Sequence, residues 1–201
     1  MKRNIFLLVF WSVLVLSCAS PNNSEHPEIT DLKQKLPTLE PDQALMKVLV
    51  GDGDFYAENL PFKTNVLLLP QSLKLGFLNK EGSNVEMEMI ADNWFERKPI
   101  AFTLANGTVG ESGGDQVIVM IGKLIDKAGL QGKGYFLVNG KIEVPELSRQ
   151  LITIAFEGNL VKPSQASAPE NYVPVKGWIV VKAPDFTSQS SPELLKKIDE
   201  D

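Results

Sequence analysis

The feature that most constrains the fold of this chain is a series of short apolar runs separated by turn residues. Between residues 44 and 182 the runs are rich in Val, Ile, Leu, Phe and Met, with Gly, Asn, Pro and Asp between them. In Val85-Glu86-Met87-Glu88-Met89 the apolar and charged residues alternate, so an extended strand would be apolar on one face only. Such a strand is expected to be half-buried in an antiparallel sheet. The same alternation recurs in residues 73–77, 100–104 and 152–156.

Counting these runs predicts an all-β fold, an antiparallel β-sandwich or barrel of roughly nine or ten strands. We expect one β domain over residues 44–185. Residues 117–121 are apolar on both faces, which predicts a central strand covered on both sides. In the tail, residues 186–201, Ser191 can cap a helix that has Pro192 at its first position, which predicts a short C-terminal helix.

Several turns and one side-chain orientation can also be predicted. Asn139-Gly140 is the strongest hairpin signal, because both residues tolerate positive φ, and Asn106-Gly107 is a second candidate. Residues 79–84 are expected to join two strands through a longer loop, and residues 123–132 to form a helical turn or a loop. Trp178 alternates with its apolar neighbours, so it belongs either to a second core layer or to a surface patch.

The beginning of the chain has the layout of an export signal. A basic start, Met1-Lys2-Arg3-Asn4, precedes a run from Ile5 to Leu16 that is apolar except for Ser12. The run is shorter than the about 20 apolar residues that a transmembrane helix requires. Residues 1–17 are therefore expected to be a signal peptide, and residues 18–43, with their Pro, Asn, Ser and charged residues, a flexible tether.

Val15-Leu16-Ser17-Cys18 resembles the lipobox of bacterial lipoproteins, although Leu16 stands where that pattern usually has a small residue. The resemblance implies cleavage before Cys18 and attachment of a diacylglycerol thioether and an N-acyl chain, an effectively permanent membrane anchor. Ala19 follows the cysteine, whereas an aspartate there favours inner-membrane retention in well-studied lipoprotein sorting, so the resemblance favours the outer membrane. The alternative is ordinary secretion, because Ser17-Cys18-Ala19 also fits a small-x-small cleavage site.

Charge, cysteine and histidine content exclude several classes of function. The formal net charge is −5, and no cluster of Lys and Arg follows the signal segment, which argues against a nucleic-acid partner. Cys18 is the only cysteine, so the domain can have neither an internal disulfide nor a thiolate metal cluster. His26 is the only histidine and lies in the expected tether, which removes Ser-His-Asp chemistry and most zinc sites from the folded part.

Acidic residues give two weak candidate sites. Asp52 and Asp54, in a Gly-Asp-Gly-Asp stretch, could bind calcium with Glu58, but the spacing is not that of an EF-hand and the same residues make ordinary turns. We expect no cofactor, with calcium as the remote exception. Glu86 and Glu88 could be paired carboxylates for glycoside hydrolysis, but the alternation predicts two equally solvated side chains.

Aromatic residues give a third candidate. Trp94 and Phe95 lie in a polar stretch, and Tyr172 lies in a long loop from residue 163 to residue 174. Together the three could form a platform for a ligand or glycan. The favoured alternative is that Trp94 and Phe95 close the open end of the core.

The C-terminal half shows a second resemblance. Its runs, residues 134–137, 140–144, 151–158 and 175–180, look like the closing strands of small β-rich envelope lipoproteins of uncharacterised function. That group implies no catalytic residues.

These observations favour a non-enzymatic, lipid-anchored envelope module that binds a glycan or protein or organises the cell surface. One alternative is an envelope glycan hydrolase that uses carboxylates alone. The other is a lipid- or solute-carrying barrel, whose apolar cavity would be lined by Leu67, Leu69, Met87 and Met89.

Overall fold

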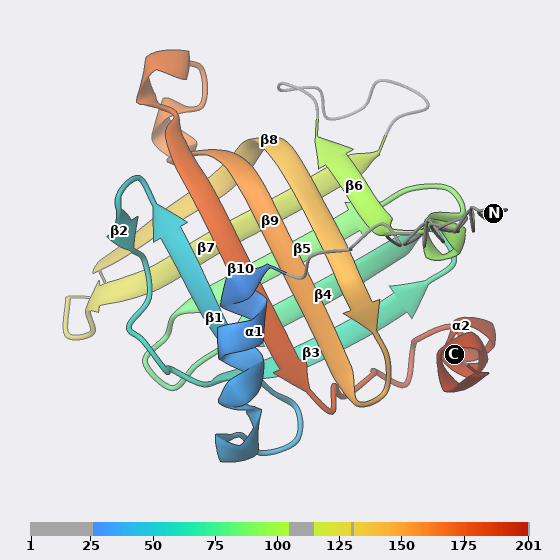
Figure 1. Ribbon diagram of the computed structural model, residues 1–201. Coiled ribbons are helices and arrows are strands. Elements are labelled where there is room, and N and C mark those ends of the chain that lie inside the picture. Colours follow the sequence, from blue (N-terminus) through green and yellow to red (C-terminus); the bar gives the residue numbers. More distant parts are fainter. Residues whose placement is uncertain (1–25, 105–114, 130, 201) are drawn as a thin grey trace, which may run out of the picture.

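The chain folds into a closed antiparallel β-barrel, shown in Figure 1 by a computed structural model that describes residues 26–104, 115–129 and 131–200. Eight strands form the barrel, and each pairs with the barrel strand that follows it in the chain. The first and last, β1 and β10, pair over their full lengths from Gln43↔Lys182 to Val50↔Val175, which closes the barrel. The barrel strands are β1 (Gln43–Val50), β3 (Phe62–Leu69), β4 (Ser72–Leu78), β5 (Asn84–Ile90), β7 (Gln116–Asp126), β8 (Gln131–Leu147), β9 (Leu151–Val161) and β10 (Val173–Lys182).

Two further strands extend this barrel. β2 (Gly53–Asp54) folds back on the end of β1, and β6 (Ile100–Leu104) pairs with the second half of β8. The first half of β8 pairs with β7. One edge of β8 therefore has β7 and then β6 as its neighbour, and the other edge pairs with β9. The prediction of an all-β barrel or sandwich with a short C-terminal helix is confirmed, because ten strands and the helix α2 are present in the described ranges.

Alternating side chains fill the barrel interior. On β5 the residues Val85, Met87 and Met89 point inward and are buried, whereas Glu86 and Glu88 lie on the outer face. The largest wholly buried side chains include Phe62, Phe77 and Phe102, which belong to one continuous cluster. The predicted loop at residues 79–84 is present, and the Asn79 side chain accepts hydrogen bonds from two of its backbone N–H groups.

The predicted hairpin at Asn139-Gly140 is wrong, because β8 runs straight through these residues. Gly140 pairs with Gly158 of β9, and both have positive φ angles, 147° and 153°. A Cβ atom on either glycine would overlap the backbone of the opposite strand. The register shifts between Leu137 and Asn139, so the paired glycines and this bulge bend the two strands together at a corner of the barrel. The second predicted turn, Asn106-Gly107, lies outside the described residues.

The prediction that residues 117–121 are covered on both faces is also wrong. Val117, Val119 and Ile121 are buried in the barrel core, but Ile118 and Met120 are 41% and 47% exposed on the outer face. The strand β7 thus has one apolar face toward solvent. Residues 123–126 belong to β7, residues 127–129 form a turn and residues 131–132 begin β8, so the described part of this stretch has a turn but no helical turn.

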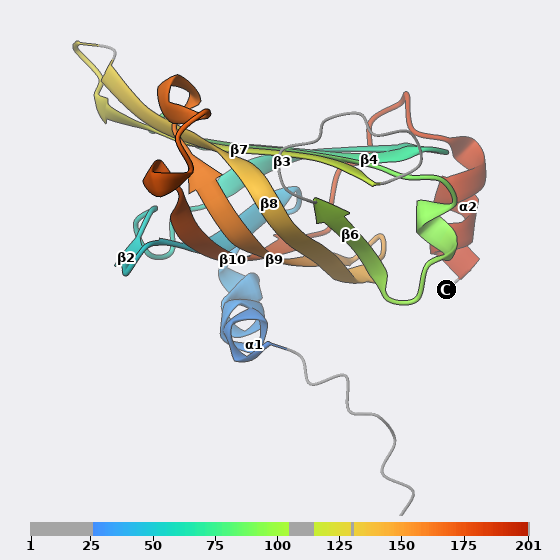
Figure 2. The ribbon, with the colours of Figure 1, turned by 90° about the horizontal axis from the view of Figure 1, so that it is seen from above.

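A helix outside the barrel replaces part of the expected flexible tether. α1 (Pro27–Gln34), followed by the 3-10 turn η1 (Leu36–Thr38), lies against the outer wall formed by β1, β9 and β10 (Figure 2). Ile29 and Leu32, one turn apart, are buried against Trp178 in a second apolar cluster. Trp178 therefore belongs to a second core layer. The other buried members of this cluster are Leu39, Leu45, Ala155 and Val180.

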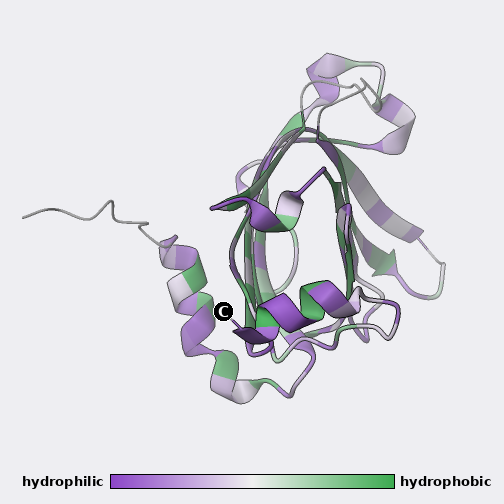
Figure 3. Ribbon diagram, turned by 90° about the vertical axis from the view of Figure 1, so that its right-hand side faces the viewer, coloured by the Kyte–Doolittle hydropathy of each residue, from purple (hydrophilic) through white to green (hydrophobic). Residues whose placement is uncertain are grey.

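The C-terminal segment completes the barrel wall and one of its ends. β1 pairs with β3 at only two positions, and the chain after β10 runs along the remaining edge of β3. There Phe186 bridges to Val66, and the N–H of Ser191 donates to the carbonyl of Leu68. α2 (Pro192–Glu200) then crosses the end of the barrel, as Figure 3 shows, with Leu194 and Ile198 buried in the core.

Both buried clusters lie within residues 29–198, so this range contains the whole core of the described fold.

Candidate ligand-binding groove

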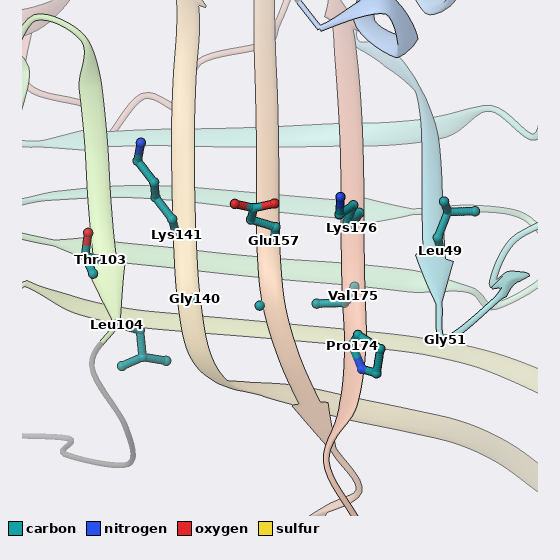
Figure 4. A pocket seen from close by; sticks show the side chains of 11 residues that line it. Leu49, Gly51, Thr103, Leu104, Gly140, Lys141, Glu157, Pro174, Val175 and Lys176 are labelled. Atoms are coloured by element: carbon teal, nitrogen blue, oxygen red, sulfur yellow. The ribbon is translucent and has the colours of Figure 1, made fainter.

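An open groove of about 600 Å³ lies on the outer surface of the barrel, where five neighbouring strands run side by side (Figure 4). It crosses β6, β8, β9, β10 and the end of β1. The residues that line it are Leu49, Gly51, Thr103, Leu104, Gly140, Lys141, Glu157, Gly158, Pro174, Val175 and Lys176.

Strand register brings the polar residues of the groove into one row. Thr103 pairs with Lys141, Lys141 with Glu157, Glu157 with Lys176, and Lys176 with Leu49. We call Lys141, Glu157 and Lys176 the charged row; Thr103 and Leu49 extend it at its two ends. All five occupy outward positions, so their side chains stand on the same face of the sheet. Figure 4 shows the carboxylate of Glu157 between the two lysines.

The adjacent row forms the side-chain-free part of the groove, because the side chains of Leu104 and Val175 are buried in the barrel core. Here Leu104, Gly140, Gly158 and Val175 lie next to one another on β6, β8, β9 and β10. Because the two central residues have no side chains, the backbone of the barrel corner is open to a ligand. Pro174 has no N–H group, and its carbonyl accepts a hydrogen bond from the N–H of Gly51.

The two lysines differ in their surroundings. Lys141 donates to the carboxylate of Glu143, its neighbour on β8, and this hydrogen bond lowers the pKa of Glu143. Within the described ranges Lys176 and Glu157 have no charged partner within salt-bridge distance, although they face each other across β9 and β10. Both side chains are exposed and can meet a bound molecule.

α1 borders one side of the groove. Trp178 lies two residues beyond Lys176 on the same outer face and is covered by the helix, and Leu49 contacts both the groove and the apolar cluster under α1. The ring of His26, just before α1, lies 6.5 Å from the Trp178 ring and 3.8 Å from a carboxylate oxygen of Glu143. His26 is thus placed beside the barrel wall rather than in a free linker.

This arrangement is suited to binding. It offers two ammonium groups, one carboxylate and the Thr103 hydroxyl beside an apolar floor. A ligand with an anionic group could pair with Lys176 while its apolar part covers Leu49, Pro174 and the glycine backbone. Glu157 is the one carboxylate among the lining residues, so the groove has no pair of carboxylates.

The three aromatic candidates are not brought together. Trp94 is wholly buried, and its Nε1–H donates to the carbonyl of Leu69. Phe95 is half-buried and packs edge-to-face on Trp94 in the 3-10 helix η2 (Trp94–Glu96), beside α2. Both therefore close the end of the core, as the favoured alternative predicted. Tyr172 lies beyond the opposite end of the barrel, after η3 (Pro163–Gln165) and η4 (Pro169–Asn171), orange in Figure 1.

The acidic candidates lie apart from the groove. Asp52 and Asp54 are exposed at the β1–β2 turn, and Glu58 forms an ion pair with Lys35 at 3.0 Å, which lowers its pKa. In the parts of the chain that the structure describes, no group of three or more His, Cys, Asp or Glu is arranged to hold a metal ion.

Glu86 and Glu88 have unequal surroundings, in contrast to the prediction of two equally solvated side chains. Glu88 forms an ion pair with Lys74 at 2.7 Å. Partial burial raises the pKa of Glu86, whose carboxylate lies against Gly76. Both point away from the barrel core.

Sequence reasoning missed the groove because its polar residues look like ordinary solvated strand positions. Lys141, Glu157 and Lys176 are spread over 36 residues of sequence, and the alternation marks each of them only as outward-facing. The one available signal was the pair of glycines inside otherwise regular strand patterns, which indicates a bulge or a close approach.

Comparison of the chain with models of known protein families, with curated proteins and with solved structures finds no match. Among the described residues, neither helix is long and apolar enough to cross a membrane. Cys18 lies outside the described residues.

Proposed function

We propose that this protein is a lipid-anchored component of a bacterial cell envelope and a non-enzymatic binding module. Ala19, the residue after Cys18, favours the outer membrane over the inner one. Support for the anchor comes from the basic start, the apolar run and the lipobox-like Val15-Leu16-Ser17-Cys18. Support for binding comes from the groove, where one row of strand partners presents Lys141, Glu157 and Lys176 beside an apolar floor.

The groove favours a particular ligand chemistry. Its charged row crosses the strands, so a ligand would lie across β8, β9 and β10 rather than along one strand. An envelope glycan or peptide segment with an acidic group next to an apolar patch fits two lysines around one carboxylate. A strongly anionic polymer would be repelled by Glu157 and by the overall negative charge.

The anchor is tested by intact-mass analysis of the protein from bacterial membranes. We expect a chain that begins at Cys18 and carries a diacylglycerol and an acyl chain, and a Cys18→Ser variant that is not lipidated. An unmodified mature chain that begins at Ser20 and is found in the medium would contradict the anchor.

The groove is tested separately with the chain from Ser20 to Asp201, which contains every described residue. Binding to envelope polysaccharides and host matrix proteins is measured for this chain and for Lys176→Ala combined with Lys141→Ala. We expect the double variant to lose about 1–3 kcal/mol of binding free energy for the ligand found, as for lost charge-assisted hydrogen bonds. Lys196→Ala on α2, remote from the groove, is the matched control. Equal binding by the double variant and the control would contradict this site.

A carrier of a small apolar ligand is the second candidate, because closed eight-stranded barrels can hold one such molecule. Of the four residues expected to line its cavity, Met87 and Met89 point into the core, whereas Leu67 and Leu69 are half-buried outside it. Binding of a fatty-acid probe is measured for the parent chain and for two variants. Binding that is lost in Met87→Trp but kept in Lys176→Ala would favour this candidate over the groove.

A further inference from the structure

The β7–β8 hairpin extends beyond the barrel wall as a separate prong, visible at the upper left of Figure 2. Near its tip Leu124 is 37% exposed and Ile125 is 66% exposed. A hairpin that projects from a barrel has solvent on both faces. Apolar side chains on either face of such a hairpin are therefore exposed, even where polar and apolar residues alternate along the strand.

The neighbouring β4–β5 turn adds a third exposed aliphatic residue. Leu78, at the end of β4, is 60% exposed. It pairs with Asn84, which pairs with Gly122 on β7, so Leu78 and the base of the hairpin share the outer face. The β4–β5 turn also contacts the hairpin directly, since Gly82 lies against the side chain of Leu124. We call Leu78, Leu124 and Ile125 the apolar tip.

Basic residues surround the apolar tip. Lys80 lies in the β4–β5 turn, Lys127 in the β7–β8 turn, and Lys123 and Lys133 face each other across the hairpin. Lys123 donates to the carbonyl of Phe55, and the ammonium group of Lys133 lies 5.4 Å from the centre of the Tyr135 ring, so both ammonium groups are held at the base of the prong. Glu81 and Asp126 are the acidic residues of these two turns, so this end has a local excess of positive charge on a chain of net charge −5.

We propose that the apolar tip inserts into the interfacial region of a phospholipid bilayer that contains anionic lipid. The tip is aliphatic and narrow, with Lys80 and Lys127 in the two turns and Lys123 and Lys133 at the base of the hairpin, a combination that lets apolar side chains enter the acyl boundary while ammonium groups face lipid phosphates. A flat protein partner would need a broad surface with a central aromatic or arginine anchor, and these three residues have neither.

The apolar strip continues from the tip onto the barrel wall. Ile118 and Met120 are exposed on the outer face of β7, the strand that leads into the hairpin. These two residues pair with Glu88 and Glu86 on the same outer face, so contact with an anionic bilayer is confined to the apolar tip. The proposal does not depend on lipidation of Cys18, because it rests on the apolar tip and its neighbouring lysines; with an anchor present, the two attachments would set the orientation of the barrel.

The test uses the unlipidated chain from Ser20 to Asp201 and sedimentation with vesicles of phosphatidylcholine, with and without phosphatidylglycerol. We expect binding to the anionic vesicles, weakened by salt, and an Ile125→Asp variant whose partition coefficient is lower by about tenfold or more. Gln150→Asp adds the same charge at the exposed β8–β9 turn, at the far end of β8, and is expected to bind like the parent chain.

A second measurement separates insertion from self-association. The chain from Ser20 has no cysteine, so Ile125→Cys places a fluorophore at the tip as its only thiol label. We expect quenching of this fluorophore by lipids brominated near the headgroup and no quenching of a label at Gln150→Cys. No vesicle binding, equal binding by Ile125→Asp, or a label that reports only a dimer in solution would each overturn the proposal.

Discussion

One pair of glycines, Gly140 and Gly158, decides how sharply the barrel wall bends at the groove. Gly140 and Gly158 oppose each other with positive φ, and a Cβ atom on either would overlap a backbone carbonyl oxygen of the other strand. A third glycine, Gly177, leaves room for the ring of Phe156, which covers it from the opposite strand. These positions admit no larger residue without movement of backbone or of a buried ring.

We expect Gly158→Ala to lower the free energy of unfolding by about 2–4 kcal/mol, because the added methyl group would overlap the carbonyl oxygen of Asn139 and φ is unfavourable for alanine. Urea denaturation followed by fluorescence measures the change. Gly53→Ala is the matched control, since a Cβ there meets no atom within 4 Å. A Gly158→Ala variant as stable as Gly53→Ala would show that the corner can relax.

Arg97 and Asp115 form the best-defined ion pair, through two hydrogen bonds of 2.8 Å. The hydrogen bonds from Arg97 lower the pKa of Asp115 below its usual range. A carboxyl group with a lowered folded-state pKa stabilises the fold above its unfolded pKa of about 3.9, and this stabilisation is lost as the pH falls through the folded-state pKa.

Asp115→Asn is therefore expected to lower the free energy of unfolding at pH 7 by about 1–2 kcal/mol, discounted because both side chains are partly exposed. The difference in the free energy of unfolding between this variant and the parent chain should become smaller below pH 4, as measured by urea denaturation at a series of pH values. Asp54→Asn, at an exposed position of β2, is the control for removal of a carboxylate that forms no such ion pair, and at pH 7 its free energy of unfolding should stay within about 0.5 kcal/mol of the parent value. A difference that stays constant down to pH 2 would contradict the role of the carboxylate charge.

At the scale of elements, α1 is held to the barrel by few side chains. Ile29 and Leu32 supply its buried face, and Lys33 adds an ion pair of 3.0 Å to Glu146 on β8. A helix of eight residues is not stable alone in water, so its structure depends on this contact with the wall.

Ile29→Ala should weaken the packing of α1 on the barrel by about 2–4 kcal/mol, because it removes a buried side chain. The helix should then detach before the barrel unfolds. Hydrogen exchange measures this directly: amides of residues 29–35 should exchange faster while those of β9 and β10 stay protected. Gln34→Ala, at an exposed position of the same helix, is the control. Equal loss of protection in the strands would mean that the helix and barrel unfold as one unit.

At the scale of the whole molecule, the barrel is closed by more than strand pairing. The segment after β10 hydrogen-bonds along β3, and α2 covers the end of the core with Leu194 and Ile198. Without this segment, the edge of β3 and the apolar core end would both be open to solvent and to other chains.

A chain that ends at Lys182 is thus expected to form oligomers or aggregates. Size-exclusion chromatography with light scattering at micromolar concentration should show this, whereas a chain that lacks only residue 201 should elute like the full chain. A monomeric, cooperatively unfolding truncated chain would show that β1–β10 pairing alone closes the barrel.

The amino-acid sequence by itself determined most of what depends on neighbouring residues. Alternating polarity predicted the strands and their inward faces, Ser191-Pro192 predicted α2, and the fold class followed from the number of runs. These features are local, because side-chain direction in a strand has a period of two and a helix cap acts over one turn.

Only the tertiary structure decided what depends on residues far apart in the chain. Asn139-Gly140 has the composition of a turn, but pairing with Gly158 made it a barrel corner, and the wall around Trp178 turned part of the expected tether into α1. The groove likewise exists only through the register of β8, β9 and β10, which places Lys141, Glu157 and Lys176 in one row. The physical reason is that strand register and burial are set by the closed sheet as a whole, so no short stretch of sequence contains them.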